Sequence, residues 1–224
     1  MRILAIAPHP DDETLGCGGT LLKHKANGDT IAWLIMTKGH EPQWSAQTLE
    51  QKEREIEKVH AAYGFEQIFK AGLPTIKLDS LPLEQLIQPI HEAISSFQPD
   101  VVYLNHANDV HSDHRAIFSA ATSVLKPFNS KRHRVKRVLS YEVLGSTDAG
   151  APNQSGSFVP NVFVDISELV DRKLEIMSLY ETEIHEFPLP RALESIKALA
   201  RYRGSTIGCA YAEAFMLVRE VQLG

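Results

Sequence analysis

Two short segments of the sequence concentrate side chains that bind metal ions and transfer protons. The first, "PHPDDE" (residues 8–13), holds one histidine and three carboxylates directly after an apolar run. The second, "NHANDVHSDHR" (residues 105–115), holds three histidines and two aspartates. Imidazole and carboxylate groups are common ligands of divalent metals, and both also act as general acids and bases. The two segments together indicate a metal site with proton-transfer groups beside it.

The spacing within these segments suits a metal with three protein ligands. His9 and Asp12, three residues apart in a turn that enters a helix, can point at one centre. A histidine from the second segment would complete a two-histidine, one-carboxylate site with open positions for water and substrate. The same triad suits non-haem iron oxygenases, so the ligands alone do not choose between zinc and iron. The surplus groups favour hydrolysis, because Asp11 is placed to act as a general base and a spare histidine as an acid.

The rest of the chain predicts the elements that would position these residues. Short apolar segments alternate with helical ones, which indicates βαβ units and a mostly parallel, Rossmann-like α/β sheet with helices on both faces. We expect strands over 2–7, 30–36, 66–70, 100–104, 135–143 and 161–164. We expect helices over 13–27, 45–63, 83–97, 112–125, 167–180 and 191–202. No internal repeat or second domain is visible, so residues 1–224 are interpreted as one domain.

Both chemical segments follow the carboxyl end of a predicted strand. In an open parallel sheet, ligands bind beyond the carboxyl ends of the strands, near the point where strand order reverses. The two segments can therefore face one crevice. Pro8 and Pro10 restrict the backbone on either side of His9 and hold it in a stiff turn.

A glycine cluster after the first strand raises the alternative of a dinucleotide site. The glycines of "GCGG" (residues 16–19) lie at least one turn inside the predicted helix, whereas a dinucleotide fingerprint places them in the turn itself. Leu21 occupies the place of the third fingerprint glycine. We therefore reject nicotinamide binding and expect these glycines to allow close packing of helix on sheet, with Cys17 as a small buried residue.

Composition narrows the partners and the compartment. A net charge of −5 argues against nucleic acid or an anionic membrane surface as the main partner. No apolar run approaches the ~20 residues of a membrane span, so we expect no membrane insertion. The two cysteines lie far apart without metal-binding spacing, which favours a reducing, cytoplasmic compartment over a disulfide framework.

The pair "PHPDDE" and "HSDH" resembles the signature of the LmbE-like (PIG-L) zinc N-deacetylases, which remove acetyl groups from N-acetylglucosamine-type substrates. The segments "TKGH", "FVPNVFVDIS", "SLYETEIHEF" and "RYRGSTIGCAYAEAF" extend the likeness over nearly the full chain. The resemblance implies a three-layer α/β sandwich and a small N-acetylated sugar as substrate. It also suggests a homo-oligomer.

The resemblance assigns roles to individual residues. It implies that His9, Asp12 and His114 ligate Zn²⁺, with Fe²⁺ or another divalent ion also suited to the ligands. Asp11 would be the general base that deprotonates the attacking water. These assignments agree with what the residue types indicate on their own.

Further roles follow from the same resemblance. His111 would be the general acid and oxyanion stabiliser, and Asp113 would form a hydrogen bond that tunes a histidine. Arg54 matches an arginine that the family uses toward substrate, although an exposed helix charge is an equal alternative. Some members carry a tyrosine two residues before the histidine that aligns with His111. Asp109 stands there in this sequence, so the resemblance assigns no role to this position.

Three functions remain at this point. The first is deacetylation of an N-acetyl amino sugar or its glycoside, and the second is hydrolysis of a larger amide conjugate. The third, metal-dependent sugar binding without turnover, is disfavoured because a structural metal site needs neither Asp11 nor His111. The sequence does not decide between the first two, because pocket size depends on the loops 41–48 and 145–160.

Overall fold

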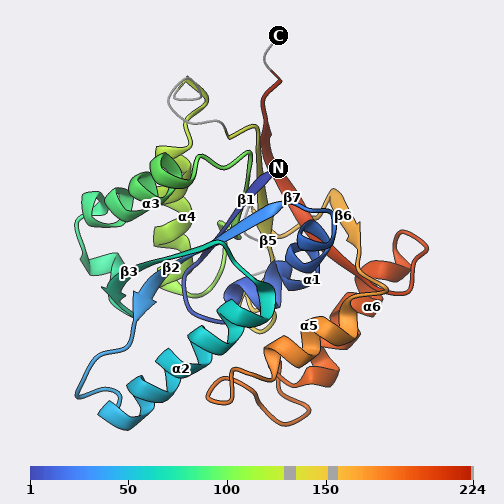
Figure 1. The fold of residues 1–224 in the computed structure, drawn as a ribbon, viewed down its shortest axis with the longest axis horizontal. Helices are drawn as coiled ribbons and strands as arrows, with labels where there is room; N and C mark the ends of the chain where they lie inside the picture. The colour runs from blue at the N-terminus through green and yellow to red at the C-terminus, as the bar shows by residue number, and fades with distance from the viewer. Residues whose placement is uncertain (129–134, 151–155, 223–224) are drawn as a thin grey trace.

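The computed structural model describes residues 1–128, 135–150 and 156–222. In this part of the chain a seven-stranded sheet has the order β3-β2-β1-β4-β5-β7-β6 (Figure 1). Its strands are β1 (Arg2–Ala7), β2 (Thr30–Lys38), β3 (Gln67–Pro74), β4 (Val101–Asn105), β5 (Arg137–Tyr141), β6 (Val162–Asp165) and β7 (Ala212–Glu220). Strands β1 to β5 run parallel, whereas β7 lies antiparallel to both of its neighbours.

Helices cover both faces of the sheet and complete a three-layer α/β arrangement (Figure 1). One face carries α1 (Asp12–Ala26), α2 (Ala46–Tyr63), α5 (Val170–Met177) and α6 (Leu193–Ser205). The other carries α3 (Leu83–Phe97) and α4 (Ser112–Val124), with a short 3₁₀ helix η1 (Leu78–Ser80) before them. None of the helices in the described residues has the length and apolar character needed to cross a bilayer.

The buried pattern of β1 shows how one strand serves both layers. Ile3 and Ala5 pack in the core shared with α1 and α2, whereas Leu4 and Ile6 pack in the core shared with α3 and α4. A parallel strand covered on both faces is apolar at every position for this reason. The predicted fold class is thereby confirmed.

The strand order places a crevice between β1 and β4. The chain runs outward from β1 through β2 to β3, then returns to β4 on the other side of β1. Strand order therefore reverses between β1 and β4, and the segments that leave their carboxyl ends diverge there. Both chemical segments of the sequence lie at this point.

The main difference from the predicted elements is β7. The sequence analysis assigned no strand to 212–220, yet this segment lies between β5 and β6 in the sheet. Within it, Glu213 is buried. Of the loop 145–160, residues 151–155 lie outside the described residues.

The glycine cluster brings α1 close to its neighbours, as predicted. A Cβ atom on Gly16 would lie 2.1 Å from the ring of Tyr141, and one on Gly18 would lie 2.4 Å from the hydroxyl of Tyr63. Such separations are shorter than any carbon contact tolerates. Glycine is therefore required at both positions if α1 is to keep its distance from the sheet and from α2.

Helix α1 is interrupted at Cys17, where φ is −140° and ψ is 17°. A break in a helix leaves N–H and C=O groups without their usual partners. Glu213 accepts hydrogen bonds from the N–H groups of Gly19 and Thr20 at 2.8 and 2.7 Å. The buried ammonium group of Lys173 donates to the carbonyl oxygen of Leu15 at 2.9 Å and to Glu213 at 2.7 Å. One buried ion pair thus supplies partners on both sides of the interruption.

Candidate metal centre and active site

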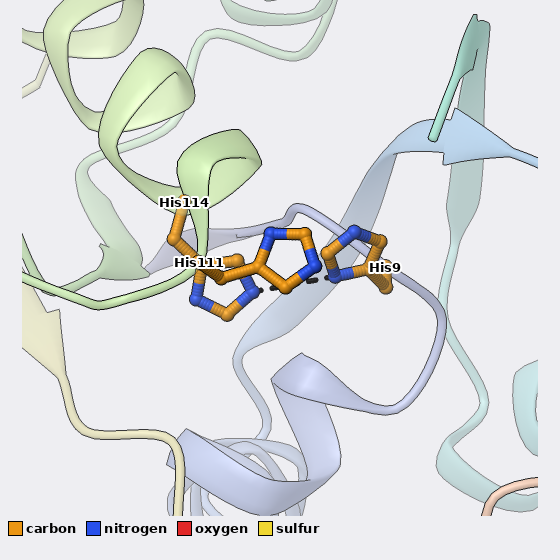
Figure 2. Close-up of side chains that lie close together, drawn as sticks. All are labelled: His9, His111 and His114. Carbon is orange, nitrogen blue, oxygen red and sulfur yellow. Dashed lines mark hydrogen bonds between the residues drawn. The ribbon is translucent and has the colours of Figure 1, made fainter. Parts of the chain in front are cut away.

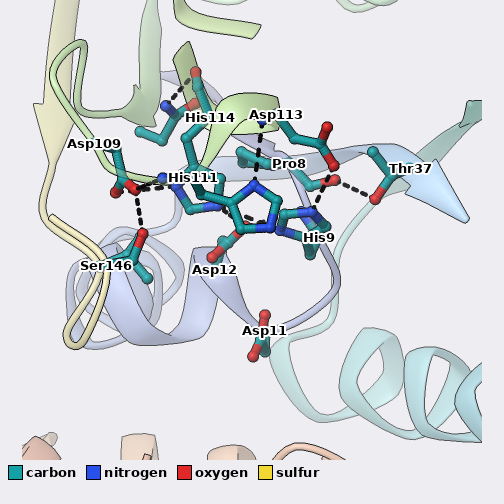
Figure 3. Close-up of polar contacts among 12 residues, drawn as sticks. Pro8, His9, Asp11, Asp12, Thr37, Asp109, His111, Asp113, His114 and Ser146 are labelled. Carbon is teal, nitrogen blue, oxygen red and sulfur yellow. Dashed lines mark hydrogen bonds and ion pairs between the residues drawn. The ribbon is translucent and has the colours of Figure 1, made fainter. Parts of the chain in front are cut away.

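Two turns at the carboxyl end of the sheet present the candidate residues. His9 and Asp11 lie in the turn from β1 to α1, and Asp12 is the first residue of α1. The turn is fixed at both ends, since Thr37 of β2 donates to the carbonyl oxygen of Pro8 at 2.8 Å and the His9 N–H donates to Asp12 Oδ2 at 2.8 Å (Figure 3). The second turn leaves β4 and enters α4, where His111 is the N-cap.

Three donor atoms of His9, Asp12 and His114 lie at nearly equal distances from one another. Asp12 Oδ2 is 3.2 Å from His9 Nδ1 and 3.2 Å from His114 Nε2, and the two nitrogen atoms are 3.3 Å apart (Figure 3). Around a tetrahedral ion with bonds near 2.0 Å, neighbouring ligand atoms are ~3.3 Å apart. These three residues therefore fit a single divalent ion.

His111 lies beside this trio. A ring nitrogen from each of His9, His111 and His114 falls within 4.8 Å of the other two (Figure 2). The rings of His9 and His111 meet edge to face, with 4.6 Å between their centroids. The structure thus brings all three predicted histidines to one centre.

Asp113 orients His9 toward that centre. Its Oδ2 lies 3.1 Å from His9 Nε2, and it accepts hydrogen bonds from the N–H groups of Ile76 at 2.7 Å and Leu78 at 3.2 Å. With the Nε2 proton shared with a carboxylate, the lone pair of His9 is at Nδ1, which faces Asp12. A carboxylate behind a ligand histidine fixes its tautomer and makes it a stronger metal ligand.

Asp109 forms an ion pair, without hydrogen-bond geometry, with the outward-facing nitrogen of His114. Its Oδ2 lies 3.1 Å from His114 Nδ1, which leaves Nε2 to face the centre. The hydroxyl groups of Ser146 and Thr147 donate to Asp109, as does the N–H of His111 at 2.8 Å. This residue, for which the sequence offered no role, therefore positions a candidate ligand (Figure 3).

The electrostatics of the trio favour positive charge at its centre. Burial alone lowers the pKa of His9, but hydrogen bonds with Asp113 and Asp12 outweigh it and raise the pKa to about 9. Burial is likewise outweighed at His114, where the charge of Asp12 contributes most to a pKa of about 10. Burial acts to raise the pKa of Asp12, yet His114 holds that pKa well below its ordinary value. A divalent cation at the centre would be stabilised by the same carboxylates that stabilise the protons on His9 and His114.

Asp11 is a buried carboxylate with free acceptor positions. Neither of its oxygens has a hydrogen-bond partner among the described residues, and Arg191 forms an ion pair with it, with Nε 3.4 Å from Oδ2. Burial raises the pKa of Asp11 well above its ordinary value, although Arg191 opposes this. A general base needs a lone pair that is free to accept a proton, and Asp11 provides one.

The backbone of Asp11 is strained. Its φ of 116° lies in the left-handed region, which non-glycine residues rarely adopt and which is found at functional sites. The next acid, Glu13, accepts a hydrogen bond from the Asp11 N–H at 3.2 Å and is itself held by the hydroxyls of Thr14 and Tyr180. The third carboxylate of "PHPDDE" therefore helps to hold the first in place.

His111 presents an N–H donor. Its Nδ1 accepts a hydrogen bond from the backbone N–H of Asp113 at 3.2 Å, so the neutral ring carries its proton on Nε2. Burial and the neighbouring His9 and His114 lower the pKa of His111, which favours this neutral form.

A pocket of about 520 Å³ opens over the cluster. Its lining includes His9, Asp11, His111 and His114, together with side chains from the segments 35–56 and 183–191. This volume is within the range of sites that hold small molecules.

Comparison with known proteins decides the family. Residues 4–125 match the family model described as GlcNAc-PI de-N-acetylase (PIG-L). This span is more than half of the 224 residues and contains both chemical segments. The chain belongs to the PIG-L family.

Individual relatives agree with the PIG-L assignment. The chain is 24% identical to diacetylchitobiose deacetylase of Thermococcus kodakarensis, over 97% of this chain and 83% of the relative. It is 29% identical to the uncharacterized deacetylase YaiS of Escherichia coli, over 74% of this chain and 82% of that one. The crystal structure of the conserved protein TT1542 from Thermus thermophilus is 29% identical, with a TM-score of 0.77 over 99% of this chain and 96% of that one.

Arg54 does not reach the site in this PIG-L protein. Its side chain is 57% exposed and pairs with Glu50 at 2.9 Å on the outer side of α2. Arg54 is not among the described residues that line the pocket. The α2 residues that face inward are Glu55, Ile56 and their helical neighbours.

A different arginine, which the sequence analysis did not single out, lies at the pocket. Arg191 pairs with Asp11 and also with Glu183 at 2.8 Å, and Glu183 in turn pairs with Lys52 of α2. Arg191, Glu183 and Lys52 all line the pocket. Their ion pairs therefore link Asp11, the candidate base, to the pocket wall. The available signal was weak: Arg191 follows "SLYETEIHEF" after a proline-rich stretch.

Proposed function

We propose that this PIG-L protein is a metal-dependent deacetylase that hydrolyses the N-acetyl group of an amino sugar or of its glycoside. The observation that carries the proposal is a trio of donor atoms spaced for one ion, beside a buried carboxylate with free lone pairs. Amides are poor electrophiles, and their hydrolysis needs both a Lewis acid and a base. The relative from Thermococcus kodakarensis, named for deacetylation of diacetylchitobiose, supports a sugar substrate.

His9, Asp12 and His114 would hold the ion. Two imidazole nitrogens and a carboxylate oxygen suit Zn²⁺, which is our proposal, and they also suit Fe²⁺. When bound, the ion polarises the acetyl carbonyl and lowers the pKa of a water molecule toward neutrality. The hydrogen bond with Asp113 would keep His9 in the tautomer that this requires, and the carboxylate of Asp109 beside His114 Nδ1 would favour the matching tautomer of His114.

Asp11 moves the proton. One of its free oxygens accepts a proton from water as the water oxygen bonds to the acetyl carbon. When the C–N bond breaks, the leaving nitrogen needs a proton, because an amine is not expelled as an anion. Asp11 can return the proton it took, and acetate and a free amine leave.

His111 stabilises the carbonyl oxygen. Its Nε2–H can donate to that oxygen as negative charge develops on it, which is the oxyanion-stabilising part of the role that the family resemblance implies. The bond that Nδ1 accepts from Asp113 supports this reading, because it keeps the neutral ring in the donor tautomer.

The test is amine release from a panel of acetylated sugars by protein loaded with about one ion per chain, the stoichiometry of a three-ligand catalytic site. We expect release with the metal and none after chelation. Release only from larger amide conjugates would favour an amidase. Binding without any hydrolysis would favour a sugar-binding protein.

The proposal extends to the setting of the enzyme. The described cysteines, Cys17 and Cys209, are both free thiols, which supports a cytoplasmic location. We treat residues 1–224 as one catalytic domain, because Arg191 and Glu213 contact the first 20 residues of the chain. A homo-oligomer remains a prediction that analytical ultracentrifugation tests.

A further inference from the structure

Ile76 has a backbone conformation that its side chain disfavours. It lies in the connection between β3 and η1, and its φ of 63° is in the left-handed region. This conformation is uncommon outside glycine and is an outlier for a β-branched residue. The two other described non-glycine residues with positive φ have settings that explain them, since Asp11 belongs to the site and Gln98 ends α3. Ile76 therefore needs compensation from its surroundings.

The side chain of Ile76 does not provide this compensation. It is 52% exposed and forms part of the pocket lining. The turn is instead anchored on either side of it. The Thr75 N–H donates to the carbonyl oxygen of Lys38 in β2 at 3.2 Å, and Leu78 is buried in the core shared with α3 and α4. A change of side chain at position 76 therefore leaves the core intact.

The compensation comes from Asp113. Its Oδ2 accepts a hydrogen bond from the Ile76 N–H at 2.7 Å, and its Oδ1 accepts one from the Leu78 N–H at 3.2 Å. The hydroxyl of Thr75 donates to Oδ2 at 3.4 Å. Backbone N–H groups that converge in such a turn form a concavity for an anion, and hydrogen bonds to an ionised carboxylate are stronger than neutral ones. The left-handed turn thus holds both oxygens of one buried carboxylate.

The same oxygen of Asp113 connects the turn to the metal trio. Oδ2, which accepts from Ile76, lies 3.1 Å from His9 Nε2, and the other ring nitrogen of His9 faces Asp12 (Figure 3). In the described part of the chain, every hydrogen bond to the Asp113 carboxylate comes from His9 or from residues 75–78. Within those residues, the turn therefore supplies all the hydrogen bonds that hold the carboxylate against the ring.

We propose that Ile76 is a positioning residue for the metal centre. Its left-handed backbone aims the Ile76 N–H at Asp113, Asp113 fixes the ring of His9, and His9 presents Nδ1 to the ion. The inference rests on the ligand trio of the proposed function. It adds that a strained turn, which itself supplies no ligand, sets the affinity for the ion. Groups behind a metal ligand change metal affinity by about 10–100-fold when they are altered.

Two substitutions separate the backbone of Ile76 from its side chain. Proline has no N–H and its ring holds φ at about −65°, so Ile76→Pro removes both the bond to Asp113 and the left-handed turn. Glycine keeps the N–H and adopts positive φ readily. Zn²⁺ affinity is measured by competition with a chromophoric chelator. We expect Ile76→Pro to weaken binding at least about tenfold and Ile76→Gly to leave it within about twofold.

Gln98 provides the matched control. It is also a non-glycine residue with positive φ, and its N–H donates to the carbonyl oxygen of Ile94 at 2.8 Å. It precedes β4, whereas the site follows the other end of that strand. Gln98→Pro should lower stability and leave Zn²⁺ affinity within about twofold, because distant sites act independently. A comparable loss of affinity in this variant would overturn the assignment to Ile76.

A double-variant cycle tests whether the effect passes through Asp113. Asp113→Ala should itself weaken Zn²⁺ binding, and Ile76→Pro should then add no more than about twofold to that loss. Asp109 lies at the other histidine, so in an Asp109→Ala background Ile76→Pro should keep its full effect. Additive losses in both backgrounds would overturn the proposal, and so would equal losses in Ile76→Pro and Ile76→Gly.

An amide-to-ester change covers the case in which Ile76→Pro does not fold. The α-hydroxy analogue of isoleucine at position 76 replaces the N–H by an oxygen and retains the side chain. It should weaken Zn²⁺ binding and shift the visible d–d bands of bound Co²⁺, which report the geometry of the ligands. Unchanged affinity and unchanged bands would overturn the proposal.

The outcomes separate this inference from the proposed function. Zn²⁺ binding that depends on Ile76, without amine release from any acetylated sugar, would retain Ile76 as a positioning residue and reject the deacetylase. Amine release by the unaltered protein, with equal Zn²⁺ affinity in all of these variants, would do the reverse.

Discussion

At the scale of single residues, Asp11 and His111 line the same pocket with opposite hydrogen-bonding capacity. Asp11 offers lone pairs that nothing in the described residues occupies, whereas His111 offers an N–H because its other nitrogen already accepts one. This difference allows their roles to be separated by substitutions that keep one capacity and remove another.

A glutamine at position 111 separates hydrogen-bond donation from proton transfer. Its side-chain amide can replace the Nε2–H donor but cannot transfer a proton at neutral pH. We expect His111→Ala to lower kcat by about 10²–10³, the usual cost of one oxyanion donor. His111→Gln should retain clearly more activity than His111→Ala. Equal losses in both variants would instead show that His111 transfers a proton, and metal loss would show that it is a ligand.

The neighbouring aspartates are distinguished by metal content. Asp11→Asn should lower turnover by roughly 10²–10⁴, the size of a general-base contribution, and should leave the metal bound. Asp12→Asn should lose the metal, because Asp12 Oδ2 lies 3.2 Å from each of the two ligand nitrogens and supplies the only negative charge among the three ligand atoms. Elemental analysis and single-turnover rates of the two variants decide this, and the reverse pattern would exchange their roles.

At the scale of elements, the bend in α1 depends on a distant ion pair. Glu213 and Lys173 are both buried, and each also bonds to backbone groups freed at the interruption. Glu213→Gln would leave the Lys173 ammonium group buried without its counter-charge. We expect a loss of about 3–5 kcal/mol in the free energy of unfolding, measured with urea. The double variant with Lys173→Met should recover part of that loss.

An exposed ion pair provides the matched control for this measurement. Arg172 and Glu175 pair at 2.8 Å on the surface of α5, and Glu175→Gln should change stability by no more than about 0.5 kcal/mol. A similarly small effect of Glu213→Gln would mean that the bend in α1 does not depend on the buried charge.

Elements with local signals were predictable, whereas the distant partners of a buried charge were not. The bounds of β1 and α3 coincide with the predicted ones, because an apolar run and an amphipathic pattern define them. In β7, by contrast, Glu213 is buried only because Lys173 and the α1 backbone meet it there. Nothing near residue 213 in the sequence reveals those partners.

The same distinction applies to the site. His9, Asp12 and His114 could be predicted to lie together because two dense segments carry them at strand ends. Arg191 became visible only when the fold placed it beside Asp11. The outward position of Arg54 could have been predicted from the sequence itself, because Ile56 and Val59 mark the buried face of α2 and Arg54 points away from it.

At the scale of the whole molecule, metal binding must compete with protons. With pKa values of about 9 and 10, both His9 and His114 are protonated in the metal-free protein at pH 7. A bound ion needs both in the neutral form, so we expect release of about two protons per ion. Calorimetry in buffers of different ionisation enthalpy measures this number, and binding without proton release would contradict the raised pKa values.

The metal-free protein should also respond to pH in one direction. A histidine pKa raised in the folded state stabilises the fold fully below the unfolded value of 6.5. That contribution is lost as the pH rises through about 9 to 10. Urea unfolding of the chelated protein between pH 6 and 10, a window on the order of these pKa values, should therefore show falling stability. The zinc-loaded protein should lack this decline, since its ligands carry no protons.

The placement of these groups along the chain sets an order for biosynthesis. His9 and Asp12 leave the ribosome early, and the third donor follows at residue 114, once β4 can pair with β1. Arg191, which neighbours the base, and Glu213, which supports the bend of α1, are translated last. A domain folds as a unit during synthesis. Because the base and the bend of α1 depend on the last residues to be made, the nascent chain carries all three ion-binding residues well before the fold that supports them, and the finished site forms only after residue 213 has left the ribosome.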